Sequence, residues 1–428
     1  MHKYKDILEY IFSKLPMYQR QGSAAYKKDL TNVIALCEAL GNPHNHMKFV
    51  HVAGTNGKGS TSHLIAGMLQ LSGYKTGLFV SPHYKDFRER IKIDGVKIDK
   101  KFIVEFVIRH KELIERINPS FFELNFVLAM LYFKTKNVDI AVIEVGIGGR
   151  LDSTNVISPL LSVITNISFD HKDMLGNTLK EIAGEKAGII KSNVPVIIGE
   201  YQEEVIDVFE AKAKELNAPL YLVKNLVAIK KINESSIMDS YQLQFFDEDK
   251  NWYFETTIIG PYQHKNLATS LAAIKVLSRH LSIDFHSVFS RFQYLGKLTG
   301  LIGRWQILGT QPLIIVDSAH NEAGLQFAIN KLQEYKYDLL HFVIGFVNDK
   351  DLSNVLSLMP TEAKYYFCKA DIPRGLHADI LKEKAVEYHL KGKAYNSVKN
   401  AFTAARKAAS ERDLIFVGGS IYVVAEVI

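Results

Sequence analysis

Between residues 48 and 200, short apolar runs rich in β-branched residues alternate with helix-like segments. The runs read KFVHVA, TGLFVS, VDIAVIEVG, LLSVITNIS and PVIIGE. Strands that are apolar along their whole length belong to sheets covered on both faces, and strands joined through helices run parallel. This rhythm predicts a parallel α/β sheet with crossover helices over the first half of the chain.

The pattern changes after residue 220. Alternating runs on either side of DEDKN, in YQLQFFDEDKNWYFETTII, predict a small antiparallel addition. The glycine-containing stretch FQYLGKLTGLIGRWQIL indicates a linker, and the β/α alternation resumes from PLIIVDSAH to DLIFVGGS. We therefore expect an α/β protein with a first domain over 1–295, a linker over 296–303 and a smaller Rossmann-like α/β domain over 304–428.

Composition excludes several classes of protein. The excess of 52 Lys and Arg over 46 Asp and Glu gives only +6, which is too small and dispersed for a nucleic-acid footprint but suits anionic small substrates. Cys37 and Cys368 stand far apart, without the spacing of a disulfide framework or a zinc site. No apolar run has signal-peptide or membrane-spanning character. We expect a cytoplasmic protein that binds neither nucleic acid nor membrane.

A glycine-rich turn joins a predicted strand to a predicted helix in FVHVAGTNGKGSTSHLIAGML. Its glycines let successive N–H groups point inward, and the following helix offers the positive end of its dipole. Lys58 can reach β- and γ-phosphates, while Ser60 or Thr61 lies near the phosphates or a bound Mg²⁺. The spacing differs from a strict P-loop, so a turn without a ligand is the alternative. Its position between strand and helix favours a phosphate site made by Gly54, Thr55, Asn56, Gly57, Lys58, Gly59 and Ser60.

Other strand ends reach the same edge of the predicted sheet, because parallel strands all end on one side. The residues there include Ser81, Glu144 and His171. Magnesium prefers oxygen ligands, so Glu144 and Ser81 are candidate direct or water-bridged ligands and His171 is a less usual nitrogen ligand. For Glu144 alone, the alternative is a strand-end carboxylate in water.

Two further segments carry glycines. GIGGRLDSTNV, residues 146–156, lacks the spacing of a dinucleotide fingerprint and is interpreted as a binding loop. In AGEKAGIIK, Lys186 follows an acidic helix start. A lysine there is usually a solvated helix residue, and the pattern by itself does not favour another role.

Taken in order, GTNGKGS, SPH, EVGIGGRLDSTN, FDH, GEKAGIIK, GRW and DSAHN resemble the folylpolyglutamate synthases, including bifunctional dihydrofolate synthases, of the Mur ligase superfamily. The resemblance covers nearly the whole chain. It implies an ATP-dependent amide ligase, acting through an acyl phosphate, that adds L-glutamate to the carboxylate of folate and also to dihydropteroate. It also implies a P-loop-type ATPase domain and a monomer.

The resemblance further implies roles for individual residues. The loop from Gly54 to Ser60 wraps the ATP phosphates. Ser81, Glu144 and His171 match Mg²⁺ positions. Lys186 matches a lysine that is carbamylated in the family and binds a second Mg²⁺, so Lys58, Glu144, His171 and Lys186 are the expected catalytic group. A monovalent cation is a further candidate cofactor.

Remaining contacts are implied in the same way. Nucleotide contacts match Asn266, Arg304, Asp317 and His320. The pterin or folate side matches Phe122, Glu123, Asn125, Leu151, Asp152 and Ser153. The family pattern often has threonine at Asn125 and glycine at Ser318, and neither departure removes a phosphate or metal ligand.

Three alternatives remain. A muramyl-peptide ligase uses the same chemistry but usually carries a further domain before the glycine-rich loop, which here follows only about fifty residues. A P-loop NTPase would hydrolyse ATP without glutamate. A non-enzymatic nucleotide-binding module would not need the predicted metal ligands.

Overall fold

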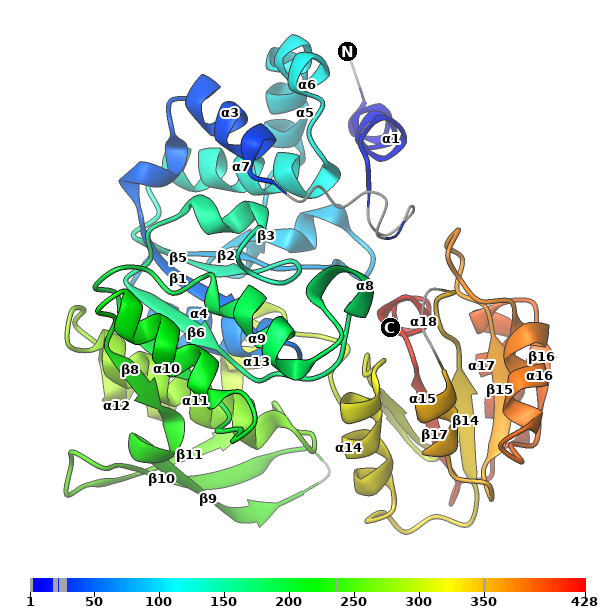
Figure 1. Cartoon of the computed structure of the whole chain (residues 1–428). Helices are drawn as coiled ribbons and strands as arrows, with labels where there is room; N and C mark the ends of the chain where they lie inside the picture. The colour runs from blue at the N-terminus through cyan, green and yellow to red at the C-terminus, as the bar shows by residue number, and fades with distance from the viewer. Residues whose placement is uncertain (1–2, 18–21, 23–28, 236, 349–351) are drawn as a thin grey trace. The chain divides into compact units, whose positions relative to one another are not determined.

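The computed structural model describes residues 3–17, 22, 29–235, 237–348 and 352–428. The chain forms two compact units. The first contains residues 1–258 and 263–300, and the second contains 259–262 and 301–428. Figure 1 shows each unit as a sheet with helices packed against it.

An eight-stranded sheet in the order β4-β3-β2-β5-β1-β6-β7-β8 forms the core of the first unit. All neighbouring pairs from β2 to β8 are parallel, and β3 and β4 add an antiparallel edge. The strands are β1 (Lys48–Ala53), β2 (Thr76–Phe79), β3 (Ile91–Ile93), β4 (Val96–Lys97), β5 (Ile140–Glu144), β6 (Leu161–Ile164), β7 (Val196–Ile198) and β8 (Leu220–Leu222).

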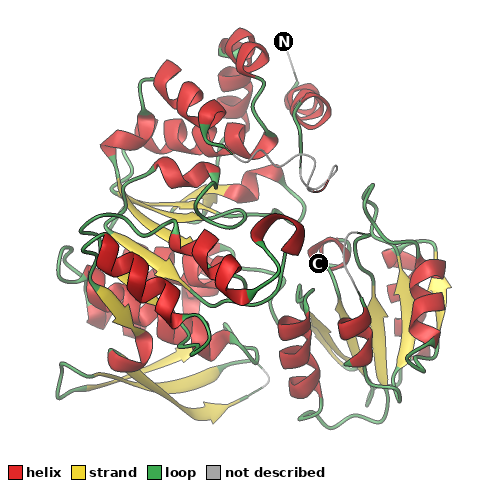
Figure 2. Cartoon of the chain, in the orientation of Figure 1, coloured by secondary structure: helices red, strands yellow, loops and turns green. Residues whose placement is uncertain are grey.

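Helices cover both faces of this sheet (Figure 2). Phe49, Phe79 and Ile143 pack on one face with helices that include α1, α3, α5 and α7. The helices and 3-10 turns of the unit are α1 (Tyr4–Lys14), α3 (Thr31–Ala39), η2 (Pro43–His46), α4 (Lys58–Leu71), η3 (Phe87–Arg90), α5 (Lys100–Arg109), α6 (Lys111–Ile117), α7 (Phe121–Thr135), η4 (Ser153–Val156), α8 (Lys172–Leu175), α9 (Leu179–Ala187), α10 (Ile206–Glu215), η5 (Val223–Asn225), α11 (Gln263–Leu277), α12 (Phe285–Ser290), η6 (Phe292–Tyr294) and α13 (Leu295–Thr299). None of the helices in the described part of the chain is long and apolar enough to cross a membrane.

A separate three-stranded antiparallel sheet has the order β11-β10-β9. Its strands are β9 (Val227–Glu234), β10 (Asp239–Phe245) and β11 (Asn251–Thr256). Aromatic rings of β11 pack on α12 and η6, with Phe254 and Phe292 centroids 4.3 Å apart. The predicted antiparallel addition is therefore confirmed, with β9 as a third strand.

The second unit is a six-stranded sheet in the order β12-β13-β17-β14-β15-β16. Only β12 is antiparallel to its neighbour. Its elements are β12 (Gln306–Thr310), β13 (Leu313–Val316), α14 (Glu322–Leu332), β14 (Leu340–Ile344), α15 (Ser353–Ser357), β15 (Lys364–Cys368), α16 (Ala378–Val386), β16 (Gly392–Tyr395), α17 (Val398–Ala408), β17 (Leu414–Gly418) and α18 (Ile421–Ala425). The predicted α/β fold class is confirmed.

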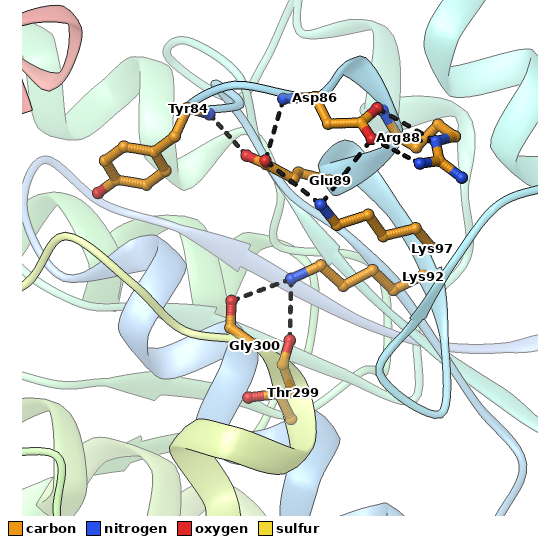
Figure 3. A network of polar contacts seen from close by, with 8 residues as sticks. All are labelled: Tyr84, Asp86, Arg88, Glu89, Lys92, Lys97, Thr299 and Gly300. Carbon is orange, nitrogen blue, oxygen red and sulfur yellow. Dashed lines mark hydrogen bonds and ion pairs between the residues drawn. The ribbon is translucent and has the colours of Figure 1, made fainter. Parts of the chain in front are cut away.

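The antiparallel edge of the first sheet is attached to the last helix of its unit (Figure 3). Lys92 Nζ donates to Thr299 O at 2.9 Å and to Gly300 O at 3.1 Å, so it caps the carboxyl end of α13. Lys92 is only 4% exposed, and burial lowers its pKa to about 8. A Cβ on Gly95 would lie 1.9 Å from Leu298 O, so the turn between β3 and β4 requires glycine there.

The unit boundaries differ in part from the predicted domains. Helix α13 occupies residues 295–299 of the segment expected to hold the linker, and the units divide after residue 300. Residues 259–262 fall in the second unit because Ile259 is buried in its core and the Tyr262 hydroxyl donates to Asp317 Oδ2.

Candidate active site

The glycine-rich loop lies between the end of β1 and the start of α4. A Cβ on Gly54 would come within 1.8 Å of Thr165 Oγ1. Gly57, with φ +84°, precedes the first residue of α4, and a Cβ there would lie 2.2 Å from Asn266 Oδ1. Glycine is therefore required at both positions by close approach as well as by backbone conformation.

Hydrogen bonds hold this loop against the segment that follows β6. Thr55 N and Asn56 N donate to the backbone and side-chain oxygens of Asn166, each at 2.9 Å. Thr165 Oγ1 donates to Asn56 O at 2.6 Å, and Ser168 N donates to Thr55 Oγ1 at 3.0 Å. The loop is thus preformed, and the amide groups of the first turn of α4 are those that a helix leaves without intrahelical partners.

Lys58 lies across this loop. Its Nζ donates to Gly54 O at 3.1 Å and to Thr55 O at 3.2 Å. The ammonium group is therefore held at the start of the glycine-rich loop by two of its backbone oxygens.

Glu144 and Ser81 meet at the same edge of the sheet. Ser81 N donates to Glu144 Oε2 at 2.9 Å, and the Glu144 side chain is buried. A Cβ on Gly59 would lie 3.7 and 3.8 Å from the two carboxylate oxygens. The structure thus brings the buried carboxylate of Glu144 against the first turn of α4 and the backbone of Ser81 against that carboxylate, as the order of strand ends indicated.

Lys186 is buried on α9 and is not the solvated lysine that its pattern favoured. Burial is the main cause that lowers its pKa to about 7, and Lys58 lowers it further. Asp170, Asp152 and Glu185 act in the opposite direction. A lysine with this pKa is a neutral amine in a substantial fraction of the molecules at neutral pH.

His171 is the N-cap residue of the short helix α8 and has a positive φ of 51°. Its backbone N donates to Asp170 Oδ1 at 3.0 Å, and its Nε2 lies 3.8 Å from Asp170 Oδ2. Within the described ranges, no group of three or more His, Cys, Asp and Glu side chains is arranged to hold a metal ion. The oxygen donors of Ser81 and Glu144 fit a Mg²⁺ that keeps water ligands.

Two of the expected acceptor-side residues gather around Gly146. A Cβ on that glycine would lie 2.7 Å from Phe122 Cζ and 3.0 Å from Asp152 Oδ2. The Phe122 ring also lies 5.6 Å from that of Phe79. Leu151 and Ser153, which flank Asp152 in the sequence, are partly exposed.

Glu123 and Asn125 are buried on α7. Glu123 Oε2 accepts from Ser120 N at 2.6 Å, and Glu123 N donates to Ser120 Oγ at 3.2 Å, so this side chain closes a capping box. Asn125 Nδ2 donates to Phe121 O at 2.6 Å. Their remaining atoms, Glu123 Oε1 and Asn125 Oδ1, are buried without a hydrogen-bond partner.

The sequence interpretation missed Gln263, which orients Asn266. Gln263 Oε1 accepts from Asn266 Nδ2 at 2.9 Å, and Gln263 Nε2 donates to Ser60 Oγ at 3.4 Å. The Asn266 amide oxygen is thereby directed toward Gly57. Only its place one helical turn before Asn266 could have indicated this role.

In the second unit, Asp317 is fully buried at the end of β13. Its carboxylate accepts from Trp305 N at 2.6 Å and from Ala319 N at 2.8 Å. Burial raises the pKa of Asp317, and Arg304 opposes that shift. His320 Nδ1 lies 3.0 Å from Ser318 O. Asp317 and His320 therefore lie in the turn after β13, and the bond from Trp305 N holds the turn before β12, which carries Arg304, against it.

Family models match most of the chain. The Mur ligase middle domain matches residues 52–274, and the Mur ligase glutamate ligase domain matches residues 303–421. The dihydrofolate synthase/folylpolyglutamate synthase of Bacillus subtilis is 31% identical over 99% of this chain and 98% of the relative. A probable bifunctional folylpolyglutamate synthase/dihydropteroate synthase of Haloferax volcanii is 32% identical over 99% of this chain, which spans only 50% of that relative.

Solved structures are similar over the full length. Escherichia coli FolC in complex with DHPP and ADP superposes with a TM-score of 0.85 at 27% identity, covering 100% of this chain and 97% of that one. A bifunctional folylpolyglutamate synthase/dihydrofolate synthase with Mn, AMPPNP and L-glutamate bound gives 0.83 at 26% identity, with coverage of 100% and 97%. The resemblance inferred from the motifs is confirmed. This chain belongs to the folylpolyglutamate synthase/dihydrofolate synthase family of Mur ligases.

Proposed function

We propose that this chain adds L-glutamate both to dihydropteroate and to a tetrahydrofolate. Family membership confirms the predicted ATP-dependent ligation of glutamate to folate, and relatives bind an ATP analogue with a divalent metal. The observation that carries the phosphoryl-transfer part of the proposal is the buried Glu144 carboxylate, which lies beside Gly59 at the start of α4. The bifunctional name of the Bacillus subtilis relative supports two acceptors.

A carboxylate is a poor acyl donor, so the acceptor carboxylate first takes the γ-phosphoryl group of ATP. The acyl phosphate is then attacked by the glutamate amine, and phosphate leaves. Negative charge on the transferred group is stabilised by the amide groups of residues 57–60 and by Lys58. Asn266, held by Gln263, borders the same loop. It would contact the nucleotide there.

Ser81 and Glu144 would hold one Mg²⁺, and His171 with Lys186 would hold a second. Held by these residues, Mg²⁺ would neutralise part of the charge on the transferred phosphoryl group. We further propose that Lys186 is carbamylated. Its amine adds to CO₂ and releases a proton, which replaces a buried cation by an anionic oxygen ligand. Its burial in the described structure favours loss of the positive charge.

The acceptor is assigned to Phe122 on α7 and to the loop 146–156, whose Asp152 lies with Phe122 beside Gly146. Leu151 and Ser153 are partly exposed beside Asp152 and would contact the pterin or folate. Glu123 and Asn125 retain a buried oxygen each, which could accept from a bound ring N–H.

Arg304, Asp317 and His320 are assigned to the nucleotide. Asp317 would act mainly by fixing the turn that carries Arg304, since its oxygens already accept two backbone N–H groups. A monovalent cation, a monomeric state and a cytoplasmic location complete the proposal. The two buried free cysteines are consistent with a reducing compartment.

Product analysis tests the proposal. The protein is incubated with MgATP, L-glutamate and either dihydropteroate or tetrahydrofolate, and products are identified by mass. One glutamate added to each acceptor is expected. Addition of glutamate to only one acceptor would show that the enzyme has one of the two activities. The absence of a glutamylated product from both acceptors would favour an NTPase.

A further inference from the structure

His51 is a buried histidine on β1 to which the proposed chemistry gives no role. The side chain is fully buried, and the two-residue period of the strand places it on the same face of the sheet as Phe49. Its Nε2 lies 2.8 Å from Thr154 Oγ1, while its Nδ1 has no hydrogen-bond partner. Burial of a polar ring costs free energy unless hydrogen bonds compensate for the lost water. The hydrogen bond to Thr154 is therefore the contact that stabilises the imidazole of His51 in this position.

The direction of the hydrogen bond between His51 and Thr154 follows from the bond that Thr154 makes to Asp152. Thr154 Oγ1 donates to Asp152 Oδ1 at 2.5 Å. A hydroxyl has one proton, so Thr154 must accept at its contact with His51. His51 therefore carries its proton on Nε2 and leaves Nδ1 unprotonated. Burial, aided by the charge of Lys191, lowers the pKa of His51 to about 3 and keeps the ring neutral.

Asp152 closes the loop at the end of this chain of hydrogen bonds. Its two oxygens accept from Ile147 N at 2.9 Å and from Thr154 N at 3.0 Å, which lie toward opposite ends of the loop 146–156. The same carboxylate borders Gly146, beside which the Phe122 ring lies. The shape of the loop next to Phe122 thus depends on the position of Asp152.

A second set of bonds holds the other side of this loop. Arg150 N donates to Glu185 O at 2.7 Å, and Asn155 Nδ2 donates to Gly188 O at 3.0 Å. These bonds tie the loop to the end of α9. The contact with His51 ties the loop 146–156 to β1, a strand in the interior of the sheet. The glycine-rich loop directly follows β1.

We propose that His51 is a positioning residue: by donating from Nε2 to Thr154, it fixes Asp152 and the loop 146–156 in the shape that receives the acceptor. The inference rests on the proposed function, because it assigns this loop to the pterin or folate. It also explains how one rigid strand supports both the nucleotide loop and the acceptor loop.

Variants at two positions test the chain of hydrogen bonds. His51→Leu removes the donor, whereas His51→Gln presents an amide N–H near the position of Nε2. Thr154→Val removes the hydroxyl, whereas Thr154→Ser keeps it. We expect His51→Leu and Thr154→Val to raise the KM for the acceptor about tenfold or more, with the KM for ATP changed by less than about twofold. His51→Gln and Thr154→Ser should restore most of the loss.

Other outcomes would overturn the proposal. A His51→Gln enzyme as impaired as His51→Leu, or a parallel rise in the KM values for acceptor and ATP, would indicate a general packing role. The tautomer is tested without any activity, by nitrogen NMR of the labelled imidazole in the wild-type protein. A neutral ring protonated on Nε2 is expected at about pH 6, and an Nδ1–H or charged ring would contradict it. Wild-type protein that shows this tautomer but no acceptor-dependent turnover would instead refute the proposed function.

Discussion

Glu144 is the residue on which the phosphoryl-transfer proposal depends most. It ends β5 with its carboxylate against the first turn of α4, and Ser81 N donates to it. Replacing Glu144 with Ala should lower kcat by about 100-fold or more while nucleotide affinity falls far less, because under the proposal Glu144 holds the Mg²⁺ that would stabilise the transferred phosphoryl group. Steady-state kinetics and nucleotide titration measure the two effects.

A matched control lies at the other end of the same strand. Asp139 directly precedes β5 and accepts from Lys75 N at 2.8 Å. Asp139→Ala also removes a carboxylate from this strand, but at the opposite edge of the sheet, so turnover should stay close to wild type. Equal losses in the two variants would contradict the metal role of Glu144.

Lys92 gives a prediction about stability and pH. Its pKa falls from 10.5 to about 8 in the folded protein because burial disfavours the charged form. Below pH 8 the buried ammonium group lowers the free energy of unfolding by its full amount. Between pH 8 and 10.5 the folded protein has lost this proton and the unfolded chain still holds it, so the free energy of unfolding rises. The free energy of unfolding of wild type relative to Lys92→Met should therefore rise by about 2 kcal/mol between pH 7.5 and pH 9.5. Urea unfolding at both pH values measures it, and a difference independent of pH would argue against the shift.

At the scale of elements, the turn into α4 offers a comparison between two glycines at the two ends of one helix. Gly57 has φ +84° and Gly73 has φ +90°, but a Cβ would collide with Asn266 only at Gly57 and would meet nothing within 4 Å at Gly73. Both Gly→Ala changes should destabilise the protein by about 1 kcal/mol from backbone strain. Only Gly57→Ala should also weaken nucleotide binding, by about tenfold or more. Calorimetric titration with an ATP analogue compares the nucleotide affinities of the two variants. Similar affinities would argue against a role of Asn266 in nucleotide binding.

The elements that could be predicted were those with their own local signal. Strands β1, β5, β6 and β7 lie in short, mainly apolar runs rich in β-branched residues, and each appears where the sequence placed it. The edge strands β4 and β16 have two and four residues and no apolar run, so they depend on pairing with their neighbours. Strand order also had no local signal, because it depends on how the crossover connections pass over the sheet.

The site divides in the same way. Ser81 and Glu144 could be predicted because a parallel sheet gathers its strand ends. The burial of Lys186 could not, since a lysine in a polar helix is usually solvated. The contact between His51 and Thr154 joins residues 103 positions apart, and nothing in either local sequence indicates it.

At the scale of the whole molecule, the chain contributes residues 259–262 to the second unit before it returns to the first. Tyr262 holds this segment by donating to the buried Asp317. Tyr262→Phe should destabilise the second unit by about 1–3 kcal/mol, because it removes a hydrogen bond from a buried carboxylate. Hydrogen exchange should quicken in β13 and α14 and stay unchanged in β1 and α4.

Tyr294 provides the control for that change, since it is 55% exposed. Tyr294→Phe should leave exchange in both units at the wild-type rate. Faster exchange across both units in Tyr262→Phe would mean that the segment 259–262 stabilises the whole chain instead of the second unit.

Phosphoryl transfer from ATP is proposed to drive the joining of glutamate to a folate-type carboxylate. The most direct measurement is phosphate release from MgATP with and without L-glutamate, using dihydropteroate and tetrahydrofolate separately. We expect sustained phosphate release to require both an acceptor and glutamate. Release at the same rate without either of them would contradict it and identify an NTPase.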